Sequence, residues 1–204
     1  MTEGRTDAAT VGPERWSEVS GVLAAAFTDD PVFGWLLPDP PSRPAALRRF
    51  FTIEARSRAL PLGSSVVATG DDGGILAAAL VIPPGHTNQS VWFQVRHGLG
   101  YARVFGRRLA RADRLQNALA RVHPTTPHVY LFAIGVRPVA QGHGVATAML
   151  APLLAQCDAE GLPAYLEATT PRNARLYRRL GFETDDVLRL DGAPVVELMI
   201  RAPR

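Results

Sequence analysis

The segment that most constrains the fold runs from His128 to Ala168. It begins with "HVYLFAIGV", a run of apolar, aromatic and β-branched residues that is typical of a strand buried on both faces. A glycine-rich turn then leads into a helical pattern from Gly142 to Glu160, which Gly161 closes. A second short apolar run, Ala164–Ala168, follows. Two strands joined by one helix lie parallel in the same sheet, with a right-handed crossover.

The remaining elements surround this unit. Periodicity predicts helices at Glu14–Phe27, from Asp29 or Asp30 to Leu37, at Arg43–Leu60, at Ser90–His97 and Tyr101–Arg121 with a break near Gly98 and Gly100, and at Arg172–Leu180. Strands are expected at Asp7–Val11, Ser64–Thr69, Gly74–Ile82, Val187–Leu190 and Val195–Ile200. The turn "GDDGG" indicates a hairpin and the last two strands are adjacent. The sequence therefore predicts an α/β (α+β) fold with a mixed, mostly antiparallel sheet of six or seven strands, a central parallel pair and helices on both faces.

Composition excludes several function classes. The chain has 204 residues, 47% of them hydrophobic and 20% charged, which is typical of one globular domain. All 22 basic residues are arginines, and they are interspersed with acids to a net charge of only +3, so we expect no nucleic-acid partner. No apolar run reaches the ~20 residues that span a bilayer, so we expect no membrane partner. One cysteine, Cys157, fits a reducing compartment and a small core side chain. We expect a cytoplasmic protein.

The turn between the first strand and its helix has the properties of an anion site. Gly142 and Gly144 let backbone N–H groups approach a ligand without a Cβ in the way. The first N–H groups of the following helix have no partner within the helix, and its dipole favours a negative charge there. The spacing is not that of a dinucleotide fingerprint, and the lysine of a P-loop is missing. An ordinary tight turn is the alternative interpretation.

Two motifs resemble those of a known family. "IGVRPVAQGHGVATAML" resembles the acetyl-CoA-binding motif Q/R-x-x-G-x-G/A of GNAT N-acetyltransferases, with Ala146 where glycine is frequent. "TPRNARLYRRLGF" resembles the next motif of that family, one helix and one strand later. The stretches "YLEATTPRNARLYRRLGF" and "AAAFTDDPVF" are most similar to the puromycin acetyltransferase-like branch. The resemblance implies a GNAT fold in a single domain, with an acceptor-side half (1–127) and an acetyl-CoA-binding half (128–204).

The resemblance also implies which residues bind acetyl-CoA. The first strand of the parallel pair splays from the second at a bulge, for which Gly135 is the natural residue, and this frees the backbone of Ile134 and Val136 for the pantetheine arm. Asn173 is expected to contact the pantetheine or the adenylate end; its alternative is a helix cap. The pyrophosphate is expected on the backbone N–H groups of Gln141, Gly142, His143, Gly144, Val145, Ala146 and Thr147. The His143 side chain faces either phosphate or solvent, and solvent is favoured. No metal is expected.

Tyr177 matches the position of the family's general acid, which protonates the departing thiolate. Its alternative is a packed helix tyrosine. Glu167 lies on the preceding strand, on the face shared with Tyr165, and is the candidate general base, acting through water. A salt bridge to a nearby arginine is the equally weighted alternative for this carboxylate. His128, His86 and His97 are weaker candidates for the base, and an acceptor that arrives neutral needs none.

The resemblance further implies an acceptor site between the first two helices, where Asp29, Asp30, Phe33 and Trp35 lie. Acids there would attract a cationic amine, and aromatic rings would pack on its body. Helix capping by the acids and core packing by the rings are the alternatives. We therefore expect an N-acetyltransferase that moves an acetyl group from acetyl-CoA to a primary amine of a small molecule, by direct attack in a ternary complex. A non-catalytic CoA-binding sensor and a protein N-terminal or lysine acetyltransferase are the alternative functions. The edges of the final strands suit a homodimer.

Overall fold

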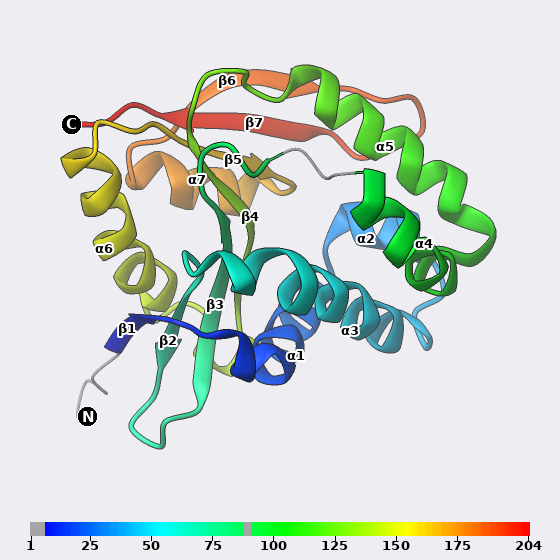
Figure 1. Cartoon of the computed structure of the whole chain (residues 1–204), viewed down its shortest axis with the longest axis horizontal. Coiled ribbons are helices and arrows are strands. Elements are labelled where there is room, and N and C mark those ends of the chain that lie inside the picture. The colour runs from blue at the N-terminus through cyan, green and yellow to red at the C-terminus, as the bar shows by residue number, and fades with distance from the viewer. Residues whose placement is uncertain (1–6, 88–90) are drawn as a thin grey trace.

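The computed structural model describes residues 7–87 and 91–204, which build one seven-stranded sheet of order β1-β2-β3-β4-β5-β7-β6 (Figure 1). The strands are β1 Asp7–Thr10, β2 Val66–Thr69, β3 Ile75–Ile82, β4 Val129–Val136, β5 Ala164–Ala168, β6 Glu183–Leu188 and β7 Val196–Arg201. Every neighbouring pair of described strands is antiparallel except β4 and β5, which are parallel. The predicted mixed sheet with a central parallel pair is confirmed.

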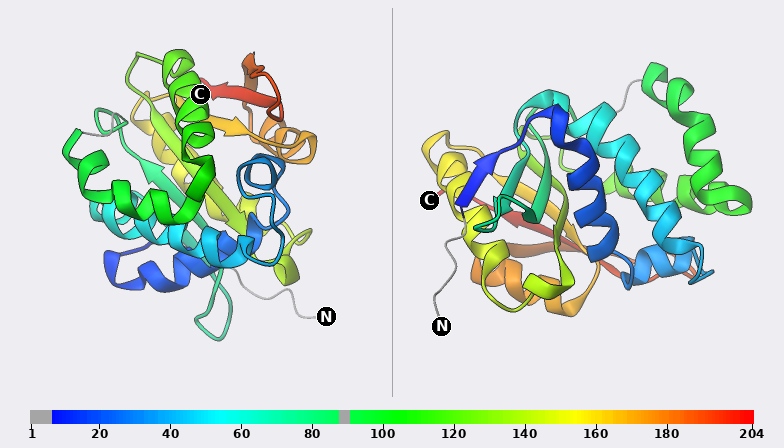
Figure 2. Two further views of the ribbon diagram at one scale, coloured as in Figure 1. Left: turned by 90° about the vertical axis from the view of Figure 1, so that its right-hand side faces the viewer. Right: turned by 90° about the horizontal axis from the view of Figure 1, so that it is seen from below.

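Helices cover both faces of this sheet, as predicted (Figure 2). One face packs against α1 Trp16–Ala26, α2 Pro31–Leu36, α3 Arg43–Glu54, α4 Val91–Phe105 and α5 Leu109–Val122. The other packs against α6 Val145–Ala159 and α7 Pro171–Arg179. Short helical turns connect these elements at η1 Pro13–Arg15, η2 Ala55–Ala59, η3 Leu60–Leu62, η4 Gly106–Arg108 and η5 Pro138–Ala140. Alternate residues of each strand enter opposite cores, because successive side chains of a strand point to opposite faces.

The predicted helix break near Gly98 and Gly100 is wrong. α4 continues through both glycines to Phe105, and the chain turns at Gly106, where φ is 52°. A Cβ on Gly100 would lie 2.8 Å from Cδ1 of Ile53 on α3. That atom is the end of a flexible side chain, so a larger residue at Gly100 would only require Ile53 to move aside. The glycine costs the helix about 1 kcal/mol in propensity without ending it.

Other boundaries shift for local reasons. The helix expected from Gly142 begins at Val145, because Gly142 and Gly144 have φ of 85° and 76°, outside the helical region. The helix expected through Leu60 is regular only to Glu54 and continues as the π-helical turn η2. The β6 strand starts at Glu183, earlier than predicted, because its exposed polar residues lack the alternation that marks a strand.

The parallel pair is splayed. β4 and β5 are in register at Val129–Ala164 and Tyr130–Tyr165, and no further pairing joins these two described strands. The bulge in β4 is not at Gly135, as predicted, but at Phe132: Leu80 of β3 pairs with Ala133 and the next residue of β3 pairs with Leu131, which leaves Phe132 as the extra residue.

Gly135 is not a bulge residue, and its structural role is in helix packing. It pairs in register with Ala78 of β3, and a Cβ built on it would lie 2.8 Å from Cβ of Ala26 and 3.0 Å from Cδ2 of Leu23. Both contacts belong to α1. The glycine therefore allows α1 to lie closely on β4, and this brings the end of α1 beside the splayed strand.

Replacing Gly135 with alanine is expected to lower the free energy of unfolding by about 1–3 kcal/mol, because the added methyl group overpacks the contact between α1 and β4. Urea denaturation followed by circular dichroism measures the change. Gly98→Ala is the matched control: a Cβ there meets nothing within 4 Å, and alanine favours a helix by up to about 1 kcal/mol. An unchanged stability of G135A would contradict the close approach.

Candidate functional site

A cleft of about 490 Å³ opens where β4 and β5 diverge. Its walls come from the end of α1 (Ala25–Phe27), the end of β4 (Ile134–Val136), the loop Gln141–Thr147, which we call the glycine loop, and one side of α7. Every residue predicted to bind acetyl-CoA lines this cleft except His143, which is exposed. The cleft thus combines four segments of the chain. Three of them, the end of β4, the glycine loop and α7, lie in the two sequence motifs, and the end of α1 does not.

Two residues near the end of β4 direct their backbone N–H and C=O groups to the side from which β5 has diverged. The Arg137 amide donates to the Leu76 carbonyl at 2.8 Å, so in this register Gly135 also faces β3 with its N–H and C=O. Hydrogen-bonding directions alternate along an antiparallel strand. The N–H and C=O groups of Ile134 and Val136 therefore point away from β3, to the side that β5 has left.

The glycine loop lies beside this edge, and its first amide, that of Gln141, donates to the Pro138 carbonyl at 3.3 Å. Gly144 is the N-cap of α6, and the Cβ positions of Gly142 and Gly144 are open, so their positive φ angles alone require glycine. The Gln141 side chain donates to the Val136 carbonyl at 3.1 Å and so ties the loop to β4. The N–H groups of the first turn of α6 have no partner in the helix. Together with the helix dipole they favour an anion.

Two arginines beside the cleft were missed by the sequence analysis. Arg172 and Arg179 on α7 line it with exposed side chains. They are two helical turns apart, so they share one side of α7, and that spacing in "RNARLYRR" was the available signal. Their charges add to the positive potential around the glycine loop.

The first turn of α7 is capped by Thr170, whose hydroxyl accepts from the Asn173 N–H at 3.1 Å. The alternative interpretation of Asn173 as the cap is therefore wrong, and Asn173 lines the cleft. Tyr177, one turn further along, is 7% exposed and packs against Phe182 at a ring distance of 6.0 Å. Its burial chiefly, and the nearby Asp30 carboxylate, raise the pKa of the Tyr177 hydroxyl. The phenol is therefore neutral throughout the physiological range.

The predicted acceptor residues separate into two pairs. Asp30 caps α2, accepting at Oδ1 from Val32 N at 2.9 Å and Phe33 N at 3.0 Å, and its other oxygen accepts from the Thr169 hydroxyl. Burial raises the pKa of Asp30. Both Asp30 and the exposed Asp29 line the cleft.

Phe33 and Trp35 do not line the cleft. The Phe33 ring lies 5.7 Å from that of Phe27 and 5.2 Å from that of Phe50, within an aromatic cluster. Trp35 lies under the Arg111 guanidinium at 4.9 Å. Core packing, the alternative for both rings, describes their position.

Glu167 lies on the opposite face of the sheet from Tyr177, and it does not line the cleft. The Tyr130 hydroxyl donates to Oε2 of Glu167 at 2.5 Å, and Nδ1 of His123 lies 3.8 Å from its Oε1. The described partners of this carboxylate are thus a tyrosine and a histidine, so the interpretation as an arginine salt bridge is wrong. His128 contacts His123 at 3.1 Å, and burial lowers the pKa of His128.

The other histidines lie apart from this group. His97 stacks on Phe93 at a ring distance of 4.5 Å, and His86 is exposed. His123 and Tyr130 are the partners that the sequence analysis missed, and no motif in the sequence marks them.

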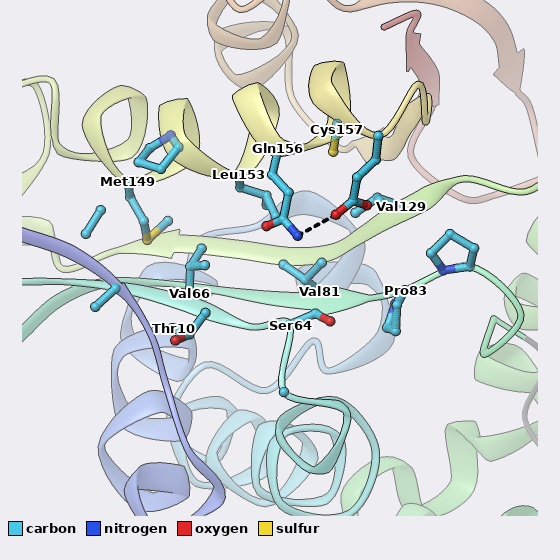
Figure 3. A pocket seen from close by; sticks show the side chains of 16 residues that line it. Thr10, Ser64, Val66, Val81, Pro83, Val129, Met149, Leu153, Gln156 and Cys157 are labelled. Carbon is cyan, nitrogen blue, oxygen red and sulfur yellow. Dashed lines mark hydrogen bonds between the residues drawn. The ribbon is translucent and has the colours of Figure 1, made fainter.

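A second cavity of about 290 Å³ lies between α6 and the first strands (Figure 3). Met149, Leu153 and Cys157 of α6 face Val66 and Val81 across it, and Gln156 donates to Glu160 at 2.7 Å along its side. Cys157 is buried, as predicted for a core residue, and burial raises the pKa of its thiol. This cavity contains no cluster of ionisable side chains.

Within residues 7–87 and 91–204, no group of three or more histidine, cysteine, aspartate or glutamate side chains is arranged to hold a metal ion. None of the described helices is both long and apolar enough to cross a membrane.

Comparisons with known proteins agree with the fold and the motifs. Residues 90–182 match the model of the acetyltransferase (GNAT) family. An uncharacterised N-acetyltransferase from Schizosaccharomyces pombe is 28% identical over 203 residues, which cover 92% of this chain and 80% of that protein.

Solved structures extend the likeness to the whole chain. A Corynebacterium glutamicum protein described as histone acetyltransferase HPA2 and related acetyltransferase superposes with a TM-score of 0.75 and 29% identity, covering 98% of this chain and 97% of that one. The polyamine N-acetyltransferase of Drosophila melanogaster, which forms N-acetylagmatine, superposes with a TM-score of 0.65 and 17% identity, covering 97% of this chain and 100% of that one. The fold is the GNAT fold, and the comparisons support an acetyltransferase of the GNAT superfamily. The likeness to the puromycin acetyltransferase-like branch stays a prediction.

Proposed function

We propose that this chain, which has the GNAT fold, transfers an acetyl group from acetyl-CoA to a primary amine of a small molecule. The observation that carries the proposal is the cleft, which is lined by a glycine loop at a helix N-terminus, by the end of β4 and by Tyr177. If the two glycines only made a tight turn, nothing would require these other groups to lie beside it.

The residues that line the cleft offer partners for the pyrophosphate and the pantetheine arm of acetyl-CoA. The N–H groups of the glycine loop would hold the pyrophosphate, with Arg172 and Arg179 adding positive charge. The backbone of Ile134 and Val136 would pair with the amides of the pantetheine arm, as in strand addition. Asn173 lies along the same wall. Bound there, acetyl-CoA supplies an activated thioester.

The side chains then account for both protons of the transfer. An acceptor that arrives as a cation first releases one proton to solvent, because only a neutral amine nitrogen can attack. That nitrogen then bonds to the acetyl carbon as the carbon–sulfur bond breaks, and the Tyr177 hydroxyl donates a proton to the leaving sulfur. Because its pKa is raised, Tyr177 keeps that proton until a thiolate develops beside it. Glu167 accepts the proton of the amine through water from the other face of the sheet. A proton taken up by Tyr177 from solvent completes the cycle.

The acceptor class follows from charge. Asp29 and Asp30 place two carboxyl groups on the cleft, which favours an amine that arrives as a cation. The Drosophila neighbour acts on polyamines by its name, which supports a small amine. The Corynebacterium relative carries the name of a histone acetyltransferase, so a lysine side chain in a protein is the second candidate. An acceptor panel of polyamines, arylalkylamines and lysine peptides distinguishes the two.

Gly144→Ala is expected to weaken acetyl-CoA binding by about 5- to 30-fold, because a left-handed alanine costs about 1–2 kcal/mol and the loop must change its backbone to avoid it. Isothermal titration calorimetry measures the dissociation constant. Gly161→Ala is the matched control, since Gly161 also has a positive φ of 66° and open space around its Cβ, at the far end of the same helix. Equal affinities of the two variants would contradict the proposed role of the glycine loop.

Tyr177→Phe is expected to lower kcat by about 10²–10⁴-fold while leaving the dissociation constant of acetyl-CoA within about twofold, because only the proton donor is removed. The release of free thiol from acetyl-CoA, with an acceptor found in the panel, measures kcat. Full turnover of Y177F would refute the acid role. Binding of acetyl-CoA without turnover on any amine would favour a CoA-binding sensor instead.

A further inference from the structure

Asp30 connects two segments that lie 139 residues apart in the chain. It directly precedes α2, and its Oδ2 accepts a hydrogen bond from the hydroxyl of Thr169, which directly follows β5. Among the described residues, no other hydrogen bond joins the helices α1, α2 and α3 to β5 or α7. The contact therefore links the wall of the cleft made by the first helices to the wall made by α7.

The Asp30 carboxylate makes its contacts inside the protein. Asp30 is 7% exposed, and its Oδ1 accepts from the backbone N–H groups of Val32 and Phe33, which caps α2. Burying a carboxylate is costly unless donors surround it, and all three contacts are accepted by its oxygens, as an ionised carboxylate requires. The Thr169 hydroxyl is the partner of the second oxygen, so it is held at the carboxylate.

A fixed Thr169 also fixes the start of α7. Only Thr169 and Thr170 lie between β5 and α7, and the Thr170 hydroxyl caps α7 by accepting from the Asn173 N–H at 3.1 Å. At the end of β5, Ala168 pairs with Glu197 of β7, whereas the pairing of β5 with β4 has ended at Tyr165. The bond from Asp30 thus holds this junction from the side on which the sheet is open.

Tyr177 depends on where α7 begins. It lies about two turns beyond the Thr170 cap, and both Asp30 and Tyr177 line the cleft. The Asp30 carboxylate also acts on the Tyr177 hydroxyl directly, because it adds to the larger effect of burial in raising the pKa of that group. A proton donor that is displaced by about 1 Å can lose about 10²-fold in rate, so its support matters to the reaction.

We propose that Asp30 is a positioning residue of the acetyl transfer: through the Thr169 hydroxyl it fixes the start of α7 and so holds Tyr177 at the cleft. This inference rests on the proposed function for the reaction that Tyr177 serves. Thr169 itself does not line the cleft, so an effect of its hydroxyl on the reaction passes through Asp30 and α7.

Hydrogen exchange of the free protein tests the contact without turnover. Thr169→Val removes the hydroxyl and nearly keeps the shape of the side chain, and Thr169→Ser keeps the hydroxyl. In T169V, the amides of Asn173 and Ala174, which donate to Thr170, should exchange about tenfold faster than in the wild type, because a hydrogen bond to a charged group is lost. In T169S they should stay within about twofold. Equal exchange of these amides in the two variants would overturn the inference.

The rate of thiol release tests the role in transfer, with both substrates saturating. T169V should lower kcat by about tenfold or more, and T169S should stay within about twofold of the wild type. In the Tyr177→Phe background, T169V should lower kcat further by less than about twofold, because the position of an absent hydroxyl no longer matters. An unchanged kcat of T169V, or equal losses in both backgrounds, would contradict the positioning role.

Thr52→Val is the control for the loss of a threonine hydroxyl elsewhere. Thr52 donates to the Arg48 carbonyl at 2.8 Å on α3 and does not line the cleft, so kcat and the exchange of the α7 amides should stay within about twofold of the wild type. The exchange experiment needs no turnover, so it separates failure of this inference from failure of the proposed function.

Discussion

The loss of pairing between β4 and β5 beyond Tyr130 is the constraint on which the rest of the site depends. The bulge at Phe132 changes the register of β4 against β3, and from there the strand keeps one partner and opens its other edge. Backbone polar groups at an open edge need partners from outside the sheet. The glycine loop, the end of α1 and α7 surround this edge and leave a cleft rather than filling it.

The opening also connects the two faces of the sheet. Tyr177 lies in the core under α6 and α7, whereas Tyr130 and Tyr165 lie in the core under α1 to α5. Successive side chains of a strand point to opposite faces, so Glu167 of β5 lies on the same face as Tyr165, the face that α1 to α5 cover. Tyr177 and Glu167 therefore lie on opposite faces of the sheet. This arrangement suits a transfer in which the leaving group departs on one side and the attacking group arrives from the other.

Local patterns in the sequence predicted the parts of the site that are local. The apolar run of β4, the two glycines and the helix after them are adjacent in the chain, so their periodicity and turn chemistry were sufficient. The bulge was misplaced because Gly135 owes its identity to the close approach of α1, a contact with Leu23 and Ala26 that no neighbouring residue reveals. Tyr130 was missed for the same reason, since its bond to Glu167 spans 37 residues. Arg172 and Arg179 were visible in the helical spacing of α7.

Hydrogen–deuterium exchange of the backbone amides, with and without acetyl-CoA, tests the central claim most directly. The account predicts that acetyl-CoA slows exchange at the amides of the glycine loop and of Ile134 and Val136, and leaves the lining of the cavity between α6 and β1 unchanged. No change at these amides, or slowing confined to that second cavity, would contradict it.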